Sequence, residues 1–239
     1  MKIEIWSDYA CPYCYIGKRQ LEKALENFSH MDNIDISFKS FELDPSASYE
    51  TTSTTKERVA KKYGYSSEQA QQMIDNVTAY ANQVGLDFHY GTTRYTNTFD
   101  AHRISKYAET KGKGAEISEK LLHGYFIENK QMSDHKVLTD IAVEVGLDKT
   151  EVEDVLKNKK FAEDVRRDEL EANTLGIHSV PCFVINEKYA ISGAQPADAI
   201  KEIIEKSLKE EMMKKFIDNK DLNGMSCGVN GCSIPNNNK

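Results

Sequence analysis

Hydrophobic and polar residues alternate in two stretches near the start of the chain, residues 1–7 and 34–43. This period of two is typical of half-buried β-strands. Residues 12–27 lie between the two stretches and carry apolar side chains at helical spacing. Pro12 suits the first turn of that helix, because a proline there loses no hydrogen bond. The pattern therefore predicts a βαβ unit at the start of the chain.

From about residue 54 to residue 175 the periodicity is almost entirely helical. Ser66 and Gln69 form a capping box ahead of one helix, and Gly85 marks the end of its apolar periodicity. This stretch contains no internal repeat and predicts an all-helical insertion. Further helices are predicted at 98–111, at 115–129 and from Asp148 onward.

Strand patterns return near the C-terminal end of the chain. Residues 181–185 and 189–192 are short runs separated by a turn, which predicts an antiparallel hairpin. A last helix is predicted from Pro196 to about Leu208, and the polar residues beyond Asp218 predict a mobile tail. The order is therefore βαβ, a helical insertion and then ββα, which places the chain in the α/β class.

Composition narrows the kind of protein. The chain has 239 residues, of which 39% are hydrophobic and 29% charged, values that fit one globular domain with a large insertion. The formal net charge of −7 gives no reason to expect a nucleic acid or an anionic membrane as partner. No stretch approaches the roughly 18 apolar residues of a membrane span. The strand pattern begins at once, without the apolar core of a secretion signal, so we expect a cytoplasmic protein with reduced thiols.

Cys11-Pro12-Tyr13-Cys14 carries the clearest chemistry in the chain. A thiol at a helix N-terminus lies near unpaired N–H groups and the positive end of the helix dipole, which favour the thiolate. Such settings lower a thiol pKa from about 8.5 to roughly 3.5–7.5. A thiolate attacks disulfides, and a second cysteine one turn away can resolve the mixed disulfide. We therefore predict that Cys11 attacks and that Cys14 resolves.

Half of a zinc site is the alternative interpretation of this pair. Zinc would need a second pair of ligands, usually within tens of residues. The candidate second pair is Cys227 and Cys232. Its spacing differs from that of Cys11 and Cys14, and it lies far from them in the chain. C-x-x-C beside a βαβ pattern is itself typical of redox proteins, so redox chemistry is the prediction and no metal is expected.

Four segments resemble one known family in the right order along nearly the whole chain. The segment Asp8–Cys14 resembles the active-site turn of DsbA-like thioredoxin-fold oxidoreductases, and Gly176–Pro181 resembles their cis-proline loop. Asn97–Arg103 and Ser192–Pro196 resemble segments of the FrnE-like branch of that family. The resemblance implies a thioredoxin-like fold. Its parts are a discontinuous domain at 1–50 and 176–210, a helical insertion at 51–175 and a tail at 211–239.

The resemblance also implies roles for residues outside the dithiol. Pro181 should face the dithiol after a cis peptide bond, leaving the backbone of Val180 free to bind an incoming peptide. A trans proline that merely begins a strand is the alternative. Asn97 and His102 should line the substrate side together with Pro12 and Tyr13, although a histidine at a helix start can also be solvated or capping.

The loop differs from the usual family sequence at two positions. Cys182 follows Pro181, where the family usually has another residue, and it is interpreted as a small buried apolar residue or as a third thiol near the site. Ser179 stands at a position that is commonly small or glycine, which bears on the conformation of the loop.

A second cysteine pair, Cys227 and Cys232, encloses two glycines in a polar segment. It resembles a C-terminal C-x4-C of some FrnE-like proteins. The tail would then pass disulfides to and from Cys11 and Cys14, because a tether raises the effective concentration of the two pairs. A redundant exposed pair and a chelator of soft metals are the alternatives.

The predicted function is a thiol–disulfide oxidoreductase acting on cysteines of proteins or small thiols. No organic cofactor is expected, because the dithiol carries the electrons. Thioredoxin or glutathione is the expected reductant, and glutathione is a candidate co-substrate. Two other functions stay open: a glutathione-dependent isomerase or transferase of the same fold, and a stress-responsive protein that holds a soft metal between the cysteine pairs.

Overall fold

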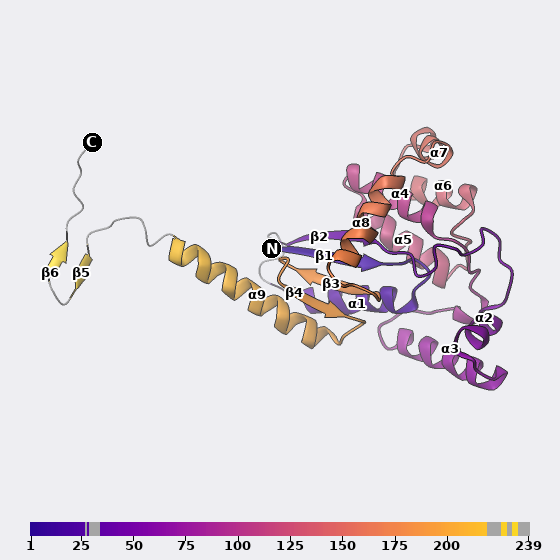
Figure 1. The fold of residues 1–239 in the computed structure, drawn as a ribbon, viewed down its shortest axis with the longest axis horizontal. Helices are drawn as coiled ribbons and strands as arrows, with labels where there is room; N and C mark the ends of the chain where they lie inside the picture. Colours follow the sequence, from indigo (N-terminus) through magenta and orange to yellow (C-terminus); the bar gives the residue numbers. More distant parts are fainter. Residues whose placement is uncertain (27, 29–33, 219–225, 229–230, 234–239) are drawn as a thin grey trace.

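A four-stranded mixed sheet lies in the middle of the molecule (Figure 1). The computed structural model describes residues 1–26, 28, 34–218, 226–228 and 231–233. The strand order is β2-β1-β3-β4, in which β1 pairs parallel with β2 and antiparallel with β3. The strands are β1 (Lys2–Ser7), β2 (Asp35–Ser40), β3 (Cys182–Ile185) and β4 (Tyr189–Ser192).

Alternate residues of the central strands cover the two faces of the sheet. Ile3 and Ile5 of β1 pack with Phe183 of β3 against helices α1 (Pro12–Leu25) and α9 (Ala197–Asp218). Trp6 points to the other face, where it packs against Ala172 of α8 (Ala162–Thr174). The sheet is therefore sandwiched between helices, and the end of β1 leads directly into the Cys11 turn.

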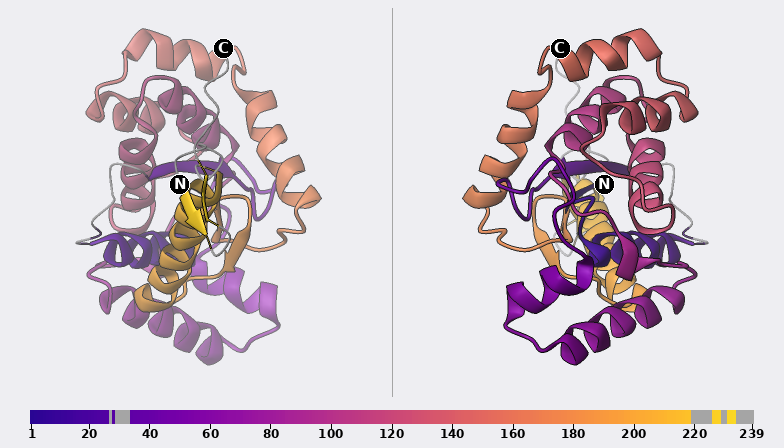
Figure 2. Two further views of the ribbon diagram at one scale, coloured as in Figure 1. Left: turned by 90° about the vertical axis from the view of Figure 1, so that its left-hand side faces the viewer. Right: turned by 90° about the vertical axis from the view of Figure 1, so that its right-hand side faces the viewer.

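The helices between β2 and β3 form the insertion and supply most of a second core. In the right-hand view of Figure 2, the purple helices α2 and α3 lie at the lower edge, away from the salmon helices at the top. Tyr15 and Ile16 of α1 belong to this second core, so the insertion packs directly on the dithiol helix. Besides α8, its elements are α2 (Thr55–Tyr63), α3 (Ser67–Asn82), η2 (Tyr90–Thr92), α4 (Phe99–Thr110), α5 (Gly114–Phe126), α6 (His135–Glu144) and α7 (Lys149–Lys157).

The sequence-based elements agree with this arrangement, and the α/β class with a helical insertion is confirmed. The Ser66 hydroxyl accepts a hydrogen bond from the Gln69 amide, and the Gln69 side chain accepts one from the Ser66 amide, which completes the predicted capping box of α3. Asp148 caps α7 in the predicted place. In the part of the chain that the structure describes, no helix is long and apolar enough to cross a membrane.

The last helix is longer than its sequence pattern predicts. The prediction ended it near Leu208, where the apolar stripe stops, but α9 continues to Asp218. Residues 209–218 contain neither glycine nor proline and are rich in Lys, Glu and Met, which are strong helix formers. Intrinsic propensity therefore extends this helix beyond the stripe that packs on the sheet.

Two short strands, β5 (Ser226–Gly228) and β6 (Gly231–Ser233), pair as an antiparallel hairpin in the tail. The sequence pattern did not predict them. Their register places Cys227 opposite Cys232. The remainder of the predicted mobile tail lies outside the described residues.

One carboxylate fastens the insertion to the dithiol helix. Glu119 of α5 accepts hydrogen bonds from Tyr15 at 2.6 Å and from Lys18 at 2.5 Å, and it pairs with Arg19. Burial alone would raise the pKa of Glu119, but the hydrogen bonds from Arg19, Lys18 and Tyr15 lower it to about 2. All three partners belong to α1, so this cluster fixes the orientation of that helix.

We expect Glu119→Gln to lower the free energy of unfolding by about 1–3 kcal/mol at pH 7, because it removes the more buried of the two carboxylates that pair with Lys18 and Arg19 and leaves them with the exposed Glu22 alone. The folded-state pKa is depressed. The stabilisation is therefore present above the unfolded-state pKa of about 4.3 and is lost as pH falls through about 2. Urea unfolding between pH 7 and pH 2 measures this dependence. Glu116→Gln, an exposed pair with Lys113 on the same helix, is the control. Equal losses in both variants would contradict the assignment.

Candidate active site

The turn between β1 and α1 places both cysteines of C-x-x-C at the start of a helix. Cys11 is the N-cap of α1 in an extended conformation, with φ −94° and ψ 114°, and Pro12 follows in the first turn. The amide of Cys14 donates to the carbonyl of Cys11 at 3.1 Å. The structure therefore gives Cys11 the helix-terminal position that the sequence predicts.

Cys11 meets the proline loop across the site. Its Sγ lies 3.6 Å from the carbonyl oxygen of Val180, which accepts the thiol hydrogen. The Val180–Pro181 peptide bond is cis, and Pro181 is buried while Val180 is half-buried. Cys11 itself is 4% exposed, whereas Tyr13 beside it is 39% exposed. The structure thus brings together residues that stand 169 positions apart in the chain.

Cys14 lies behind Cys11 and is 2% exposed. Its Sγ accepts a hydrogen bond from the Asp8 amide at 3.5 Å, and both cysteines are free thiols. Burial raises the pKa of Cys14 well above its ordinary value, and Cys11 raises it further. The Ser7 hydroxyl and the Asp8 amide oppose this only in part. Cys14 is therefore a protonated thiol near neutral pH.

Asp8 organises the turn and was missed as a site residue from sequence. Its carboxylate accepts the amide of Leu43 at 2.7 Å and that of Ala10 at 3.2 Å, and its carbonyl accepts the amide of Cys11 at 3.0 Å. The hydrogen bond from the Ala10 amide closes an Asx-turn, in which an aspartate accepts from the backbone amide two residues later. That local signal was readable in Asp8-Tyr9-Ala10-Cys11, although the long-range partner Leu43 was not.

His102 lies under this turn. Its Nε2 is 3.7 Å from Asp8 Oδ1, and its ring lies 4.8 Å from the ring of Tyr9. Burial alone would raise the pKa of Asp8, but His102 and the amides of Leu43 and Ala10 together lower it below its ordinary value. His102 is only 2% exposed and lies inside α4, whose N-cap is Thr98, so the solvated or capping alternative is wrong.

Asn97 joins the start of α4 to the loop after β2. Its Oδ1 accepts the amide of Phe99 at 2.9 Å, and its Nδ2 donates to the carbonyl of Pro45 at 3.2 Å. Asn97 and His102 are both buried and contact protein groups. A direct role of either side chain in substrate binding stays a prediction.

The other sequence candidates flank the Val180–Pro181 pair. Cys182 is buried among Trp6, Ala172 and Val184, as its interpretation as a small apolar residue requires, and burial raises its pKa. Ser179 is exposed, and its hydroxyl lies 3.5 Å from that of Ser192. Among the residues that the structure describes, no group of three or more His, Cys, Asp or Glu could hold a metal ion.

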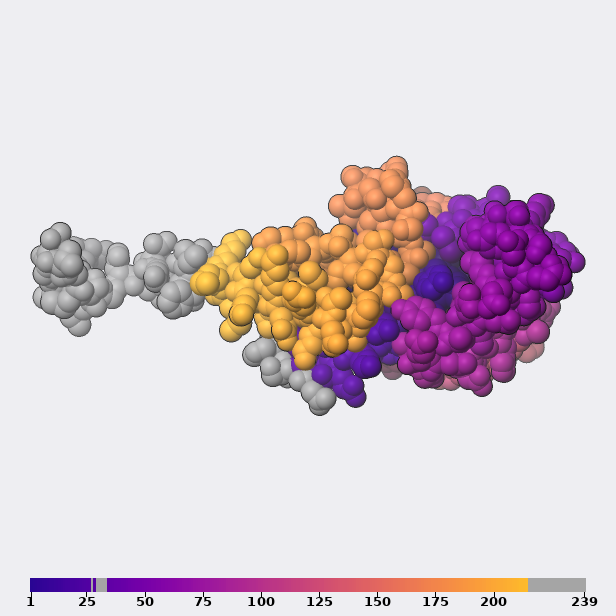
Figure 3. All heavy atoms as spheres, turned by 90° about the horizontal axis from the view of Figure 1, so that it is seen from below, coloured from indigo at the N-terminus to yellow at the C-terminus, as the bar shows by residue number. Residues whose placement is uncertain are grey.

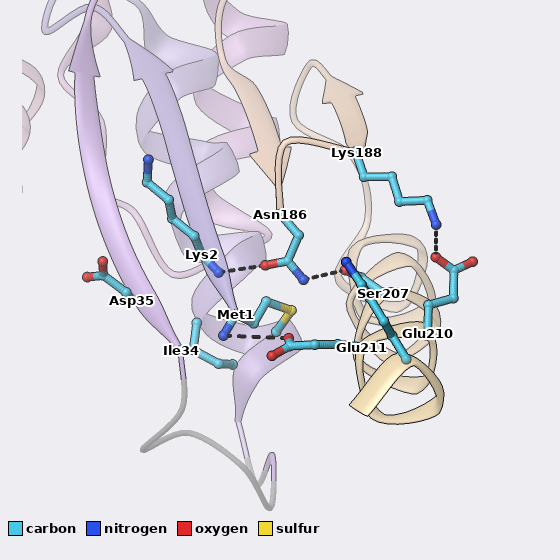
Figure 4. Close-up of a pocket in the computed structure, with 10 residues that line it drawn as sticks. Met1, Lys2, Ile34, Asp35, Asn186, Lys188, Ser207, Glu210 and Glu211 are labelled. Atoms are coloured by element: carbon cyan, nitrogen blue, oxygen red, sulfur yellow. Dashed lines mark hydrogen bonds and ion pairs between the residues drawn. The ribbon is translucent and has the colours of Figure 1, made fainter. Parts of the chain in front are cut away.

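A cavity of about 770 Å³ lies at the other end of the sheet, near the start of β1 (Figure 4). There the Lys2 amide donates to Asn186 at 2.8 Å, and Asn186 donates to Ser207 of α9 at 2.9 Å. These bonds tie α9 to the sheet. Since the cysteines follow the opposite end of β1, about 20 Å of strand separates this cavity from them.

Gly17 permits the first turns of α1 to approach the proline loop. A Cβ at this position would lie 2.9 Å from Pro181 Cγ and 3.1 Å from Phe183 Cζ, both of which are parts of rigid rings. Close packing here therefore requires a residue without a side chain.

Comparisons with known proteins agree with this fold. A model described as a DSBA-like thioredoxin domain matches residues 2–205. The uncharacterized protein YwbO of Bacillus subtilis strain 168 is 26% identical over 216 residues, which are 89% of this chain and 98% of that protein. The structure of a probable DsbA oxidoreductase from Streptomyces coelicolor is similar with a TM-score of 0.84 and 35% identity, covering 98% of this chain and 99% of that one. The cytosolic disulfide reductase DsbM from Pseudomonas aeruginosa shares the fold, with a TM-score of 0.61 and 13% identity over 87% of this chain and all of that one. None of these matches distinguishes the FrnE-like branch, which stays a prediction.

We expect Asp8→Asn to lower the free energy of unfolding by about 1–3 kcal/mol at pH 7, because the amide cannot accept every bond that the carboxylate accepts. The folded-state pKa of Asp8 is lowered. Its stabilisation is therefore present above the unfolded-state value of about 3.9 and is lost as pH falls below it. Urea unfolding at pH 7 and near pH 3 tests this. The exposed Asp140→Asn is the control, and a difference from wild type that stays constant with pH would refute the role of the charge.

Gly17→Ala should lower the free energy of unfolding by about 1–3 kcal/mol through overpacking, despite the gain of about 1 kcal/mol in helix propensity. Gly124→Ala in α5 is the matched control, because its Cβ would meet the flexible ends of Ile141 and Lys130 at 3.2 and 3.3 Å. Chemical denaturation of both variants compares them. Equal stability of the two variants would show that the close approach at Gly17 does not restrict which residue can stand there.

Proposed function

The chain belongs to the DSBA-like thioredoxin domain family, and on this premise we propose that it exchanges disulfides through Cys11 and Cys14. The observation that carries the proposal is the asymmetry of the two thiols. Cys11 caps the N-terminus of α1 beside Val180, and Cys14 lies behind it with a raised pKa. A helix N-terminus favours a thiolate at the first position, and burial favours a thiol at the second.

The proposed reaction has two steps. The Cys11 thiolate attacks one sulfur of a substrate disulfide, forming a mixed disulfide and releasing the other substrate sulfur as a thiolate that takes a proton. Cys14 then loses its proton and attacks Cys11 Sγ. The second substrate thiol leaves, and the Cys11–Cys14 disulfide forms. Two electrons pass from the dithiol to the substrate, and the reverse sequence oxidises a substrate dithiol.

The proline loop supplies the proposed peptide-binding edge. Val180 contacts Cys11 through its carbonyl. Pro12 and Tyr13 follow Cys11 in the first turn of α1, and Tyr13 is exposed. A substrate strand that pairs with the Val180 backbone would thus hold its cysteine against Cys11. Pro181 excludes a competing backbone donor, because proline has no N–H.

The C-terminal pair is proposed as a relay. Residues that face each other in an antiparallel pair have Cα atoms about 4.5–5.5 Å apart, within the range of a disulfide. The register of Cys227 and Cys232 fits this condition. We propose that this pair exchanges disulfides with Cys11 and Cys14 in the cytoplasm, with thioredoxin or glutathione as reductant and no organic cofactor.

Insulin reduction tests the proposal. Cys11→Ser should abolish turnover, because the attacking sulfur is removed, and Cys227→Ser/Cys232→Ser should slow regeneration more than the first exchange. Cys182→Ala, which removes a buried thiol outside the dithiol, is the control and should retain turnover. Stopped-flow and steady-state rates separate the two stages. Full activity in Cys11→Ser would refute the assignment.

A further inference from the structure

A cavity of about 740 Å³ lies between the loop after β2 and helix α2. The loop contributes Leu43 and several hydroxyl side chains, and α2 contributes three cationic side chains. We call it the α2 cavity. Its cationic lining residues are Arg58, Lys61 and Lys62.

The three cations have no carboxylate partner in the described part of the chain. No ion pair among the described residues involves Arg58, Lys61 or Lys62, and Lys62 Nζ lies 5.7 Å from the centroid of the Tyr63 ring. The two acidic residues that line the cavity are engaged elsewhere. Glu57 accepts from the amide and hydroxyl of Thr54, and Asp44 accepts from Ser46. Three cations against two carboxylates give the lining a formal net charge of +1, so the cavity offers net positive charge to a ligand.

Arg58 is held in place without being neutralised. Its guanidinium lies over the ring of Tyr95 at 4.2 Å, while its Nε and Nη2 atoms are buried and have no hydrogen-bond acceptor in the protein. A guanidinium offers a planar fork that matches a carboxylate. Arg58 lines the cavity without an ion pair, so a carboxylate ligand would gain a charge-assisted hydrogen bond from its guanidinium.

The α2 cavity adjoins the dithiol turn. Leu43, which lines it, donates its amide to the Asp8 carboxylate of that turn. Burial raises the pKa of Tyr90, the charge and hydrogen bond of Arg58 oppose this, and Cys11 adds to it, so Tyr90 links the two groups. In Figure 3 the indigo atoms of the N-terminal segment reach the surface between the purple atoms and the orange atoms nearer the C-terminus.

Exposed aromatic side chains lie on the dithiol turn and at the end of α2. Tyr13 of the dithiol helix is exposed and lies 6.4 Å from Tyr80, measured between ring centroids. Tyr63 at the end of α2 stacks on Tyr65 at 5.5 Å, and both are exposed, as is Leu43, which lines the cavity. Such amphipathic rings are typical of surfaces that contact polypeptides.

We propose that the α2 cavity binds acidic side chains of a polypeptide substrate that flank its disulfide-forming cysteine. This inference rests on the proposed function and names its substrate class. The cysteine would lie against Cys11 and Val180, the neighbouring residues would contact the tyrosines, and a glutamate or aspartate would reach Arg58. The size of the cavity and the exposed rings favour a polypeptide over a small disulfide.

Two synthetic peptides test the proposal. Each holds the same internal disulfide, flanked by two glutamates in one and by two lysines in the other. Oxidation of the reduced enzyme is followed by acid quench, alkylation and mass spectrometry, and each rate is divided by that of the same peptide with dithiothreitol. The wild type should prefer the glutamate peptide about tenfold, and the preference should fall as ionic strength rises.

Lys61→Gln/Lys62→Gln should reduce this preference several-fold, Arg58→Gln should reduce it further, and Lys61→Glu/Lys62→Glu should invert it. Lys149→Gln/Lys157→Gln, which removes two exposed charges from α7, is the matched control and should keep it. Neutral 2-hydroxyethyl disulfide separates the two hypotheses. A wild type that reacts with this probe but treats both peptides alike overturns the acidic-substrate inference alone, whereas one that reacts with neither overturns the proposed function.

Discussion

The buried carboxylate of Asp8 is the interaction on which the dithiol turn depends. A carboxylate out of water is costly unless charge and hydrogen bonds compensate it. Here the compensation comes from His102 in the insertion and from the amides of Ala10 and Leu43. One side chain thus joins the turn, the exit of β2 and α4. Since the loop that begins at Leu43 is also a wall of the α2 cavity, the same anchor positions the dithiol and the candidate docking surface.

The insertion is part of the site rather than an addition to it. Tyr9 in the turn contacts Ser118 of α5 at 3.3 Å, and Glu119 of the same helix binds three side chains of α1. The sheet and the insertion therefore both hold α1, the helix that begins at the dithiol, in its position. A thioredoxin-like sheet alone would leave Tyr15 and Ile16 of α1 exposed, because their core lies in the insertion.

Much of the fold could be predicted because its signals are local. Strand alternation, the capping box at Ser66 and the C-x-x-C after β1 each depend on a few neighbouring residues. Residues joined by distant packing could not be paired in this way. Asp8 and His102 stand 94 positions apart, and the residues around either one do not indicate that the two side chains meet. The end of α9 was missed for the opposite reason. The apolar stripe reports packing on the sheet, and helix propensity continues after that packing stops.

On the proposed mechanism, the asymmetry of the two thiols also sets the order of events. Cys11 is itself one of the causes that raise the pKa of Cys14, after burial. As long as Cys11 carries a thiolate, a second charge beside it is disfavoured, and Cys14 stays protonated. Formation of the mixed disulfide removes that charge. The contribution of Cys11 to the raised pKa of Cys14 is then lost, while burial, the largest cause, remains, and the Ser7 hydroxyl and the Asp8 amide still oppose it. On this mechanism, attachment of a substrate at Cys11 therefore favours the resolving step at Cys14.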